Sequence, residues 1–229
     1  MLILVIAEAE LERIPASIAT QPAIVRYASQ KGKPATKLIL DSNYHHAAMN
    51  NLTEGRRRGR PDITHLILLT ALESILNKQG KLQVYIHTRN DEVITVSSQT
   101  RIMRSDERFT GLLEQLFDTG AVPDLQKPLL SLRKQTLPEL LAELHPDHVF
   151  ACDQHGTPTL LSDYYKRLHQ QQKTRIVAII GGFPSGTFHT DLSTIVNEAI
   201  SLYPDMLVAW AVASELIVTY EHATRQASP

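Results

Sequence analysis

Four runs of almost uninterrupted apolar residues constrain the fold of this chain more than any other feature. They occupy residues 2–7, 37–41, 148–153 and 175–180. A strand with one face in water alternates apolar and polar residues, whereas a strand covered on both faces is apolar throughout. Segments with helical patterns separate these runs, near residues 63–79, 106–118, 136–144, 162–171, 191–200 and 208–224. The alternation predicts an α/β sandwich around a mostly parallel sheet.

Two shorter runs have a different pattern. QVYIHT (83–88) and EVITVS (92–97) alternate apolar and polar residues, and the turn residues Asn90 and Asp91 lie between them. This pattern predicts an antiparallel hairpin with one face in water. Because an arginine-rich segment precedes the hairpin, we interpret roughly residues 43–105 as an insertion into the α/β core.

The composition limits which partners the chain can attract. Its 229 residues, 43% of them hydrophobic, are enough to bury a full core. The formal net charge of −1 gives no overall attraction to nucleic acid or to a membrane, although a local patch still acts over a screening length of about 10 Å. Cys152 is the only cysteine, so an internal disulfide is excluded and a structural thiol in a reducing compartment is expected.

Neither apolar end of the chain has the pattern of a targeting or membrane segment. The N-terminal run lacks a basic leader and is followed at once by acidic residues, which is typical of a buried first strand. The stretch at 206–218 contains Glu215 and is too short to span a bilayer. We therefore expect a cytoplasmic protein with no membrane partner.

The ten histidines do not have the spacing of a metal site. His45 and His46 are adjacent and point apart on any regular element, and no HExxH or Cys/His ligand pattern occurs. No serine lies in a nucleophile-elbow motif and no carboxylate pair forms a known catalytic signature. The sequence therefore predicts no metal and gives little support to covalent or metal-assisted hydrolysis.

Four arginines are concentrated in the segment GRRRGRPD (55–62). Its glycines let a partner approach the backbone closely, and arginine side chains are suited to phosphate groups. Asp62, two residues after Arg60, can fix that guanidinium in one orientation, or it can begin a helix electrostatically. A solvated turn is the alternative interpretation of the segment.

A second basic segment follows the hairpin. Arg101, Arg104 and Arg108 are spaced three and four residues apart, so they share one side if the segment is helical. Together with the four arginines before the hairpin they predict a local binding site for an RNA or DNA backbone. A surface helix with salt bridges is the alternative.

The loop IIGGFPSG (179–186) follows the last of the four apolar runs. Its glycines have the spacing of a phosphate-binding loop, but Thr187 replaces the lysine and Phe188 replaces the Ser or Thr. No dinucleotide fingerprint occurs either. Gly181 and Gly182 leave space for a flat ring or a ribose, so this loop and the later segment SLYPDML predict an apolar pocket suited to adenosyl and thioether groups. Ordinary loops that close a core are the alternative.

Five segments, in this order, closely resemble the ribosome-biogenesis pseudouridine N1-methyltransferases of the SPOUT class, in their archaeal form. The segments are LDSNYHHAAM (40–49), GRPDITHLILL (59–69), YIHT (85–88), IIGGFPSG (179–186) and MLVAW (206–210). The resemblance covers essentially the whole chain. It implies one SPOUT methyltransferase domain over residues 1–229, of Rossmann-like sandwich architecture, with a C-terminal trefoil knot and the inserted β-hairpin region described above.

The resemblance also implies the ligands and the residues that bind them. S-adenosylmethionine is the implied methyl donor, a pseudouridine in a hairpin loop of small-subunit rRNA is the acceptor, and the protein is a homodimer. The implied cofactor-binding residues are Gly181, Gly186, Leu202, Tyr203, Pro204, Asp205, Met206 and Leu207. The implied RNA-binding residues are Arg60, Arg101, Arg104 and Arg108, with Asp62 steadying Arg60.

The catalytic base is not assigned, since Asp62 is better explained by its role beside Arg60. A second hypothesis is a non-catalytic ribosome-assembly factor that binds rRNA and keeps a vestigial cofactor pocket. The intact glycine loop argues against it. A third hypothesis, a nucleotide hydrolase, is poorly supported because the loop lacks its lysine.

Overall fold

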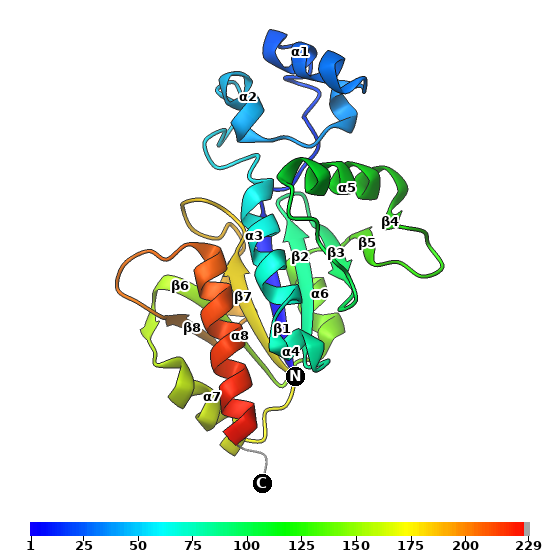
Figure 1. The fold of residues 1–229 in the computed structure, drawn as a ribbon. Coiled ribbons are helices and arrows are strands. Elements are labelled where there is room, and N and C mark those ends of the chain that lie inside the picture. The colour runs from blue at the N-terminus through cyan, green and yellow to red at the C-terminus, as the bar shows by residue number, and fades with distance from the viewer. Residues whose placement is uncertain (227–229) are drawn as a thin grey trace.

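The computed structural model describes residues 1–226, and within them the strands form one eight-stranded sheet in the order β4-β5-β3-β2-β1-β7-β6-β8 (Figure 1). The strands are β1 (Leu2–Ala9), β2 (Leu82–Thr88), β3 (Glu92–Val96), β4 (Ala121–Val122), β5 (Leu130–Lys134), β6 (His148–Pro158), β7 (Ile176–Gly181) and β8 (Glu198–Ser201). The helices are α1 (Pro22–Lys31), α2 (Ser42–Met49), α3 (Pro61–Leu72), α4 (Ile75–Lys78), α5 (Asp106–Thr119), α6 (Leu137–Leu144), α7 (Leu161–Gln170) and α8 (Ala209–Gln226), with short 3-10 turns η1 (Ala35–Lys37) and η2 (Leu192–Thr194).

The sheet has a parallel half and an antiparallel half. β1 pairs in parallel with β2 and β7, and β6 pairs in parallel with β7 and β8. The remaining pairs, β2 with β3, β3 with β5 and β4 with β5, are antiparallel. The alternating residues 83–97 form β2 and β3, and β2 is also a direct neighbour of β1, so this hairpin is part of the main sheet. The wider insertion at about 43–105 stays an interpretation.

The central strand β1 is apolar throughout because it packs on both faces. Leu2, Leu4 and Ile6 belong to one hydrophobic cluster, and Ile3 and Val5 belong to the cluster on the opposite face. Each of these side chains is fully buried. The α/β class predicted from the uninterrupted apolar runs is therefore confirmed.

Different helices cover the two faces of the sheet. α3, α7 and α8 lie on one face, where α8 packs beside both α3 and α7 (Figure 1). α6 supplies four buried leucines to the cluster on the other face. This arrangement leaves the carboxyl ends of β1, β6 and β7 at one edge of the sandwich, where ligands of open α/β sheets bind.

A small lobe of α1 and α2 projects from this edge (Figure 1). It has a hydrophobic cluster of its own, to which Leu38 and Leu40 contribute. The strand predicted at 37–41 is wrong. Ile39 forms only an isolated bridge with Arg13 and packs against the main core, whereas its neighbours Leu38 and Leu40 are buried in the lobe, so the segment does not pair as a strand of the sheet.

Two predicted helices also differ from the structure. The helix predicted at 191–200 is wrong, because this segment contains η2 and then β8, whose Ile200 is buried against β6 in parallel pairing. The helix predicted at 63–79 is two helices, since Ser74 ends the first segment and caps α4. Pairing with β6 fixes the conformation of β8, and short-range periodicity does not contain that information.

Among residues 1–226 the structure contains no helix long and apolar enough to cross a membrane.

The buried ring of His45 makes stability depend on pH. His45 lies on α2 and is fully buried; its Nδ1 accepts from the Asp41 backbone N at 2.9 Å, and its Nε2 has no protein partner. Burial lowers the pKa of His45 from 6.5 to about 4. Between these values the unfolded chain binds a proton at His45 and the folded chain does not, so stability falls as the pH drops.

We expect this contribution to destabilise the protein by roughly 2 kcal/mol at pH 4.5 relative to pH 7. Urea denaturation from pH 7 to 4.5 of the wild type and of His45→Gln measures it. Burial raises the pKa of Asp41, which has the opposite effect on the pH dependence, but Asp41 is present in both proteins. Identical pH dependence in the two proteins would contradict the assignment to His45.

Candidate functional site

A cavity of about 460 Å³ lies at the carboxyl ends of β6, β7 and β8. Its walls are the loop after β7, the segment after β8, the beginning of α8 and two residues of the α3 N-terminus. The lining residues include Arg60, Ile63, Cys152, Asp153, Gln154, His155, Ile180, Gly181, Phe183, Pro184, Ser185, Gly186, Thr187, Phe188, Ile200, Ser201, Leu202, Tyr203, Asp205, Met206, Leu207, Val208, Ala209, Trp210 and Val212.

Most of the residues expected to bind the cofactor line this cavity. They are Gly181, Gly186, Leu202, Tyr203, Asp205, Met206 and Leu207, whereas Pro204 lies in the same segment outside the lining. Tyr203 and Met206 are more than half exposed. The structure therefore brings the glycine loop and the segment SLYPDML to opposite parts of one cavity, although about 20 residues separate them in the chain.

The glycines of the loop have different structural roles. A Cβ on Gly181 would lie 2.7 Å from the ring of Phe183, and a Cβ on Gly182 would lie 2.6 Å from the backbone Cα of Ala9. Gly186 has a φ of +90°, which L side chains rarely adopt. Gly182 thus permits the loop to pack on β1, whereas Gly181 and Gly186 shape the side that faces the cavity.

Arg60 and Asp62 connect the arginine-rich loop to this cavity. Arg60 is the residue before Pro61, which begins α3, and its guanidinium donates to both carboxylate oxygens of Asp62 at 2.8 and 2.7 Å. The hydrogen bonds that Arg60 donates to the Asp62 carboxylate raise the pKa of Arg60. Because both oxygens of Asp62 accept from Arg60, the geometry favours an orienting role for this carboxylate over that of a base.

The arginines after the hairpin lie elsewhere. Arg101, Arg104 and Arg108 are exposed, and none of them lines the cavity. The helical condition for their alignment on one side is not met, because α5 begins only at Asp106 and Arg101 and Arg104 precede it. Ser105 caps that helix, and the ring of His65 contacts the Met103 carbonyl at 2.7 Å, which holds the preceding segment in an irregular conformation.

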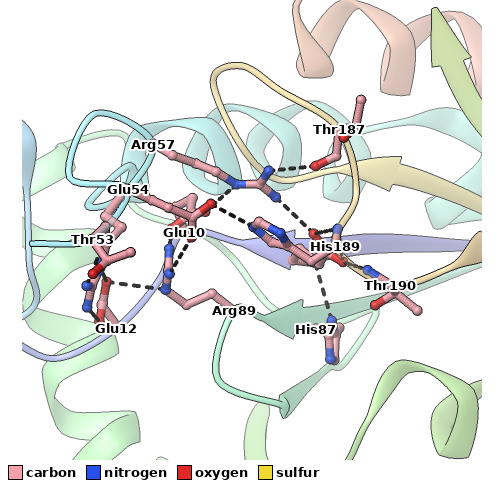
Figure 2. Close-up of polar contacts among 12 residues, drawn as sticks. Glu10, Glu12, Thr53, Glu54, Arg57, His87, Arg89, Thr187, His189 and Thr190 are labelled. Atoms are coloured by element: carbon pink, nitrogen blue, oxygen red, sulfur yellow. Dashed lines mark hydrogen bonds and ion pairs between the residues drawn. The ribbon is translucent and has the colours of Figure 1, made fainter. Parts of the chain in front are cut away.

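Arg57 and Arg58 are not available to a phosphate. Arg57 is 8% exposed and its guanidinium donates to Glu8 and Glu10 at 2.9 and 2.8 Å, while Arg58 donates to both oxygens of Glu12 at 2.6 Å (Figure 2). The binding surface predicted for the whole segment 55–62 is therefore reduced, since two of its four arginines neutralise buried carboxylates. The alternation of three glutamates at the end of a buried strand is the sequence signal for this network.

Cys152 is the residue in the cavity lining with a potentially nucleophilic thiol, but its environment keeps that thiol unreactive. Burial raises the pKa of the Cys152 thiol to about 12, so the thiol stays protonated at neutral pH. In the part of the chain that the structure describes, no group of three or more His, Cys, Asp or Glu side chains could hold a metal ion. Besides its apolar walls, the cavity is lined by polar side chains that include Arg60, Asp153 and Asp205.

Comparisons with known proteins give consistent results. The model of the EMG1/NEP1 methyltransferase family matches residues 4–221. The chain is 50% identical over 219 residues to the ribosomal RNA small subunit methyltransferase Nep1 of Pyrococcus furiosus, covering 95% of each protein. It is 41% identical over 228 residues to the protein of the same name from Methanothrix thermoacetophila, covering 100% of this chain and 99% of the relative.

A solved structure is also similar over its whole length. The crystal structure of Archaeoglobus fulgidus Nep1 bound to S-adenosylhomocysteine has a TM-score of 0.85 and 30% sequence identity to this chain. The match covers 97% of this chain and 98% of the other.

The two adjacent glycines provide a matched test of the loop geometry. Gly182→Ala forces its Cβ against the backbone of β1, where hydrogen bonds to Ala7 and Glu10 hold the loop on both sides. We expect a loss of roughly 1–3 kcal/mol in the free energy of unfolding. Gly181→Ala meets a side-chain ring rather than backbone, and a side chain can shift more easily, so we expect a smaller loss, of less than about 1 kcal/mol. Urea denaturation compares them, and an equal loss would contradict these packing roles.

Proposed function

Because this chain belongs to the EMG1/NEP1 methyltransferase family, it is an S-adenosylmethionine-dependent methyltransferase of small-subunit rRNA, and we propose that it methylates N1 of a pseudouridine in a hairpin loop of that RNA. The family membership confirms the resemblance found in the sequence. It also disfavours the alternative of a non-catalytic assembly factor.

The observation that carries the proposal is the position of Arg60 in the wall of the cavity. The cavity is walled largely by apolar groups and by a glycine loop without a phosphate-binding lysine, which suits an adenosyl group and a thioether. Arg60, oriented by Asp62, gives the same cavity a phosphate-binding side chain. A methyl donor and an RNA backbone can therefore meet at this edge of the sheet.

The residues proposed for the cofactor fit its chemistry. Gly181 and Gly186 provide the close backbone approach, and the segment 202–207, which includes Pro204, provides the opposite wall. When bound, S-adenosylmethionine supplies an electrophilic methyl group. The neutral Cys152 thiol has no part in a covalent intermediate, so the chain's contribution is to hold donor and acceptor in line and to exclude water.

The choice of pseudouridine follows from the acceptor atom. In uridine N1 carries the ribose, whereas in pseudouridine the ribose is attached through carbon and N1 carries a hydrogen. That proton must leave as the new bond forms, and we assign no residue as its acceptor. A single-stranded loop lets the target base leave its stack at low cost and enter the cavity.

The remaining features of the proposal concern the RNA surface and the assembly. Arg101, Arg104 and Arg108 extend the RNA-binding surface from the cavity toward α5, where their exposed side chains can reach phosphates. We further propose one domain over residues 1–229, a C-terminal trefoil knot, a homodimer and a cytoplasmic location. The exposed apolar side chains of Tyr203, Met206 and Val208 support a second copy packing near the cavity.

Methyl transfer to paired RNA hairpins tests the reaction. We expect labelled S-adenosylmethionine to label a hairpin that contains pseudouridine and to leave the uridine version unlabelled. Gly181→Val, whose branched side chain would displace the Phe183 ring at the wall of the cavity, is the control and should bind no S-adenosylhomocysteine. Equal labelling of both hairpins would rule out N1 as the acceptor. Cofactor binding without any methyl transfer would instead support the hypothesis of a non-catalytic ribosome-assembly factor.

RNA binding by the exposed arginines has its own test. Arg104→Ala should weaken binding of the hairpin and flatten the slope of log affinity against log salt by about 1, because one phosphate contact is lost. Cofactor affinity should stay unchanged. Arg167→Ala on α7, which removes an exposed arginine paired with Glu198, is the matched control. An equal loss in both variants would show a nonspecific charge effect.

A further inference from the structure

Arg57 extends from the arginine-rich loop into the loop that follows β7 (Figure 2). Its Nη1 donates to the Thr187 carbonyl at 2.6 Å, and its guanidinium carbon lies 3.9 Å from the centre of the Phe183 ring. A Cβ on Gly186 would lie 3.4 Å from the same Nη1. One buried guanidinium therefore contacts the loop at two points, the Thr187 carbonyl and the Phe183 ring, although the Arg57–Thr187 hydrogen bond spans 130 residues of sequence.

Glu8 holds the loop from the other side of this guanidinium. Its carboxylate accepts from Nη2 of Arg57 and from the backbone N–H groups of His189 and Thr190, at 2.8 to 2.9 Å. Glu8 has a φ of 50° at an irregular position of β1, where its pairing register with β2 shifts. This uncommon conformation accompanies a carboxylate that accepts hydrogen bonds from both segments.

Resting on the proposed position of the cofactor, we propose that Arg57 is a positioning residue for cofactor binding. Through Glu8, Phe183 and Thr187 it fixes the loop 183–190 in the conformation that leaves the cavity open beside Gly181 and Gly186. Arg57 is absent from the cavity lining, so it acts through the loop and does not touch the cofactor.

The chemistry of arginine is needed for this role. A planar guanidinium can stack on a ring while it donates in its own plane to two carboxylates and a carbonyl. A lysine in the same place keeps the positive charge, but its ammonium group has no planar face to stack on the ring, and its three N–H donors are all on one nitrogen. Lysine therefore preserves most of the charge balance with Glu8 and Glu10 and releases the loop.

Arg58 is a matched control from the adjacent position. It is also largely buried and pairs with Glu12, in the segment that follows β1, through two hydrogen bonds at 2.6 Å. The contacts described for Arg58 reach Glu12 and Thr53 and do not include the loop 183–190. Arg58→Lys thus disrupts a comparable ion pair without altering the cofactor side.

The test measures binding of S-adenosylhomocysteine by calorimetry and initial rates with the pseudouridine hairpin. We expect Arg57→Lys to weaken binding roughly tenfold, within the range typical of coupling between sites, and to raise the KM for S-adenosylmethionine to a similar degree. Because Arg57 touches no reacting atom, kcat at saturating cofactor should stay within about twofold of the wild type. Arg58→Lys should show neither change.

A second variant keeps the test independent of one substitution. Glu8→Gln weakens the other end of the link, and Arg57→Lys with Glu8→Gln should cost little more than either change alone, because both act on one contact network. Unchanged affinity in Arg57→Lys, an equal loss in Arg58→Lys, or additive losses in the double variant would overturn the proposal. Failure of the wild type to bind S-adenosylhomocysteine would instead overturn the proposed function.

Discussion

The pairing of buried carboxylates with arginines at the end of β1 is the interaction on which the site depends. Glu8, Glu10 and Glu12 are each at most 3% exposed. Unpaired buried charges are strongly destabilising, so each needs a cation within hydrogen-bond distance. Arg57, Arg58 and Arg89 supply these cations from two other segments of the chain. The requirement for charge neutralisation therefore fixes three loops around one edge of the sheet.

This electrostatic constraint has a consequence for the chemistry. Arg57 and Arg58 are occupied by carboxylates, so the arginines that remain available for the proposed phosphate contacts are Arg60 at the cavity, the exposed Arg56 and the exposed arginines before and within α5. The loop beside Gly181 is shaped by protein contacts and contains no lysine. The same edge of the sheet can therefore accept a ligand without a triphosphate and still contact an RNA backbone next to it.

Secondary-structure elements that depend on local residue patterns were predicted accurately from the sequence, whereas elements fixed by long-range contacts were not. The apolar runs of β1, β6 and β7 and the turn at Asn90 are local, and these elements occur within a few residues of the expected positions. The segment 37–41 has the same apolar character, yet it packs in the α1–α2 lobe. Apolar content reports burial without specifying the partner, so it does not distinguish a sheet strand from a buried connection.

The sequence by itself determined the α/β class and the glycine loop without a phosphate-binding lysine, because each depends on residues close together in the chain, and it left the pairing of Arg60 with Asp62 as one of two roles for that carboxylate. Only the tertiary structure decided which arginines are free. Arg57 and Arg60 are three residues apart and chemically identical, but one is buried against Glu8 and Glu10 and the other lines the cavity. That difference arises from contacts with β1 and with the loop after β7, and such long-range contacts set the electrostatic environment of a side chain.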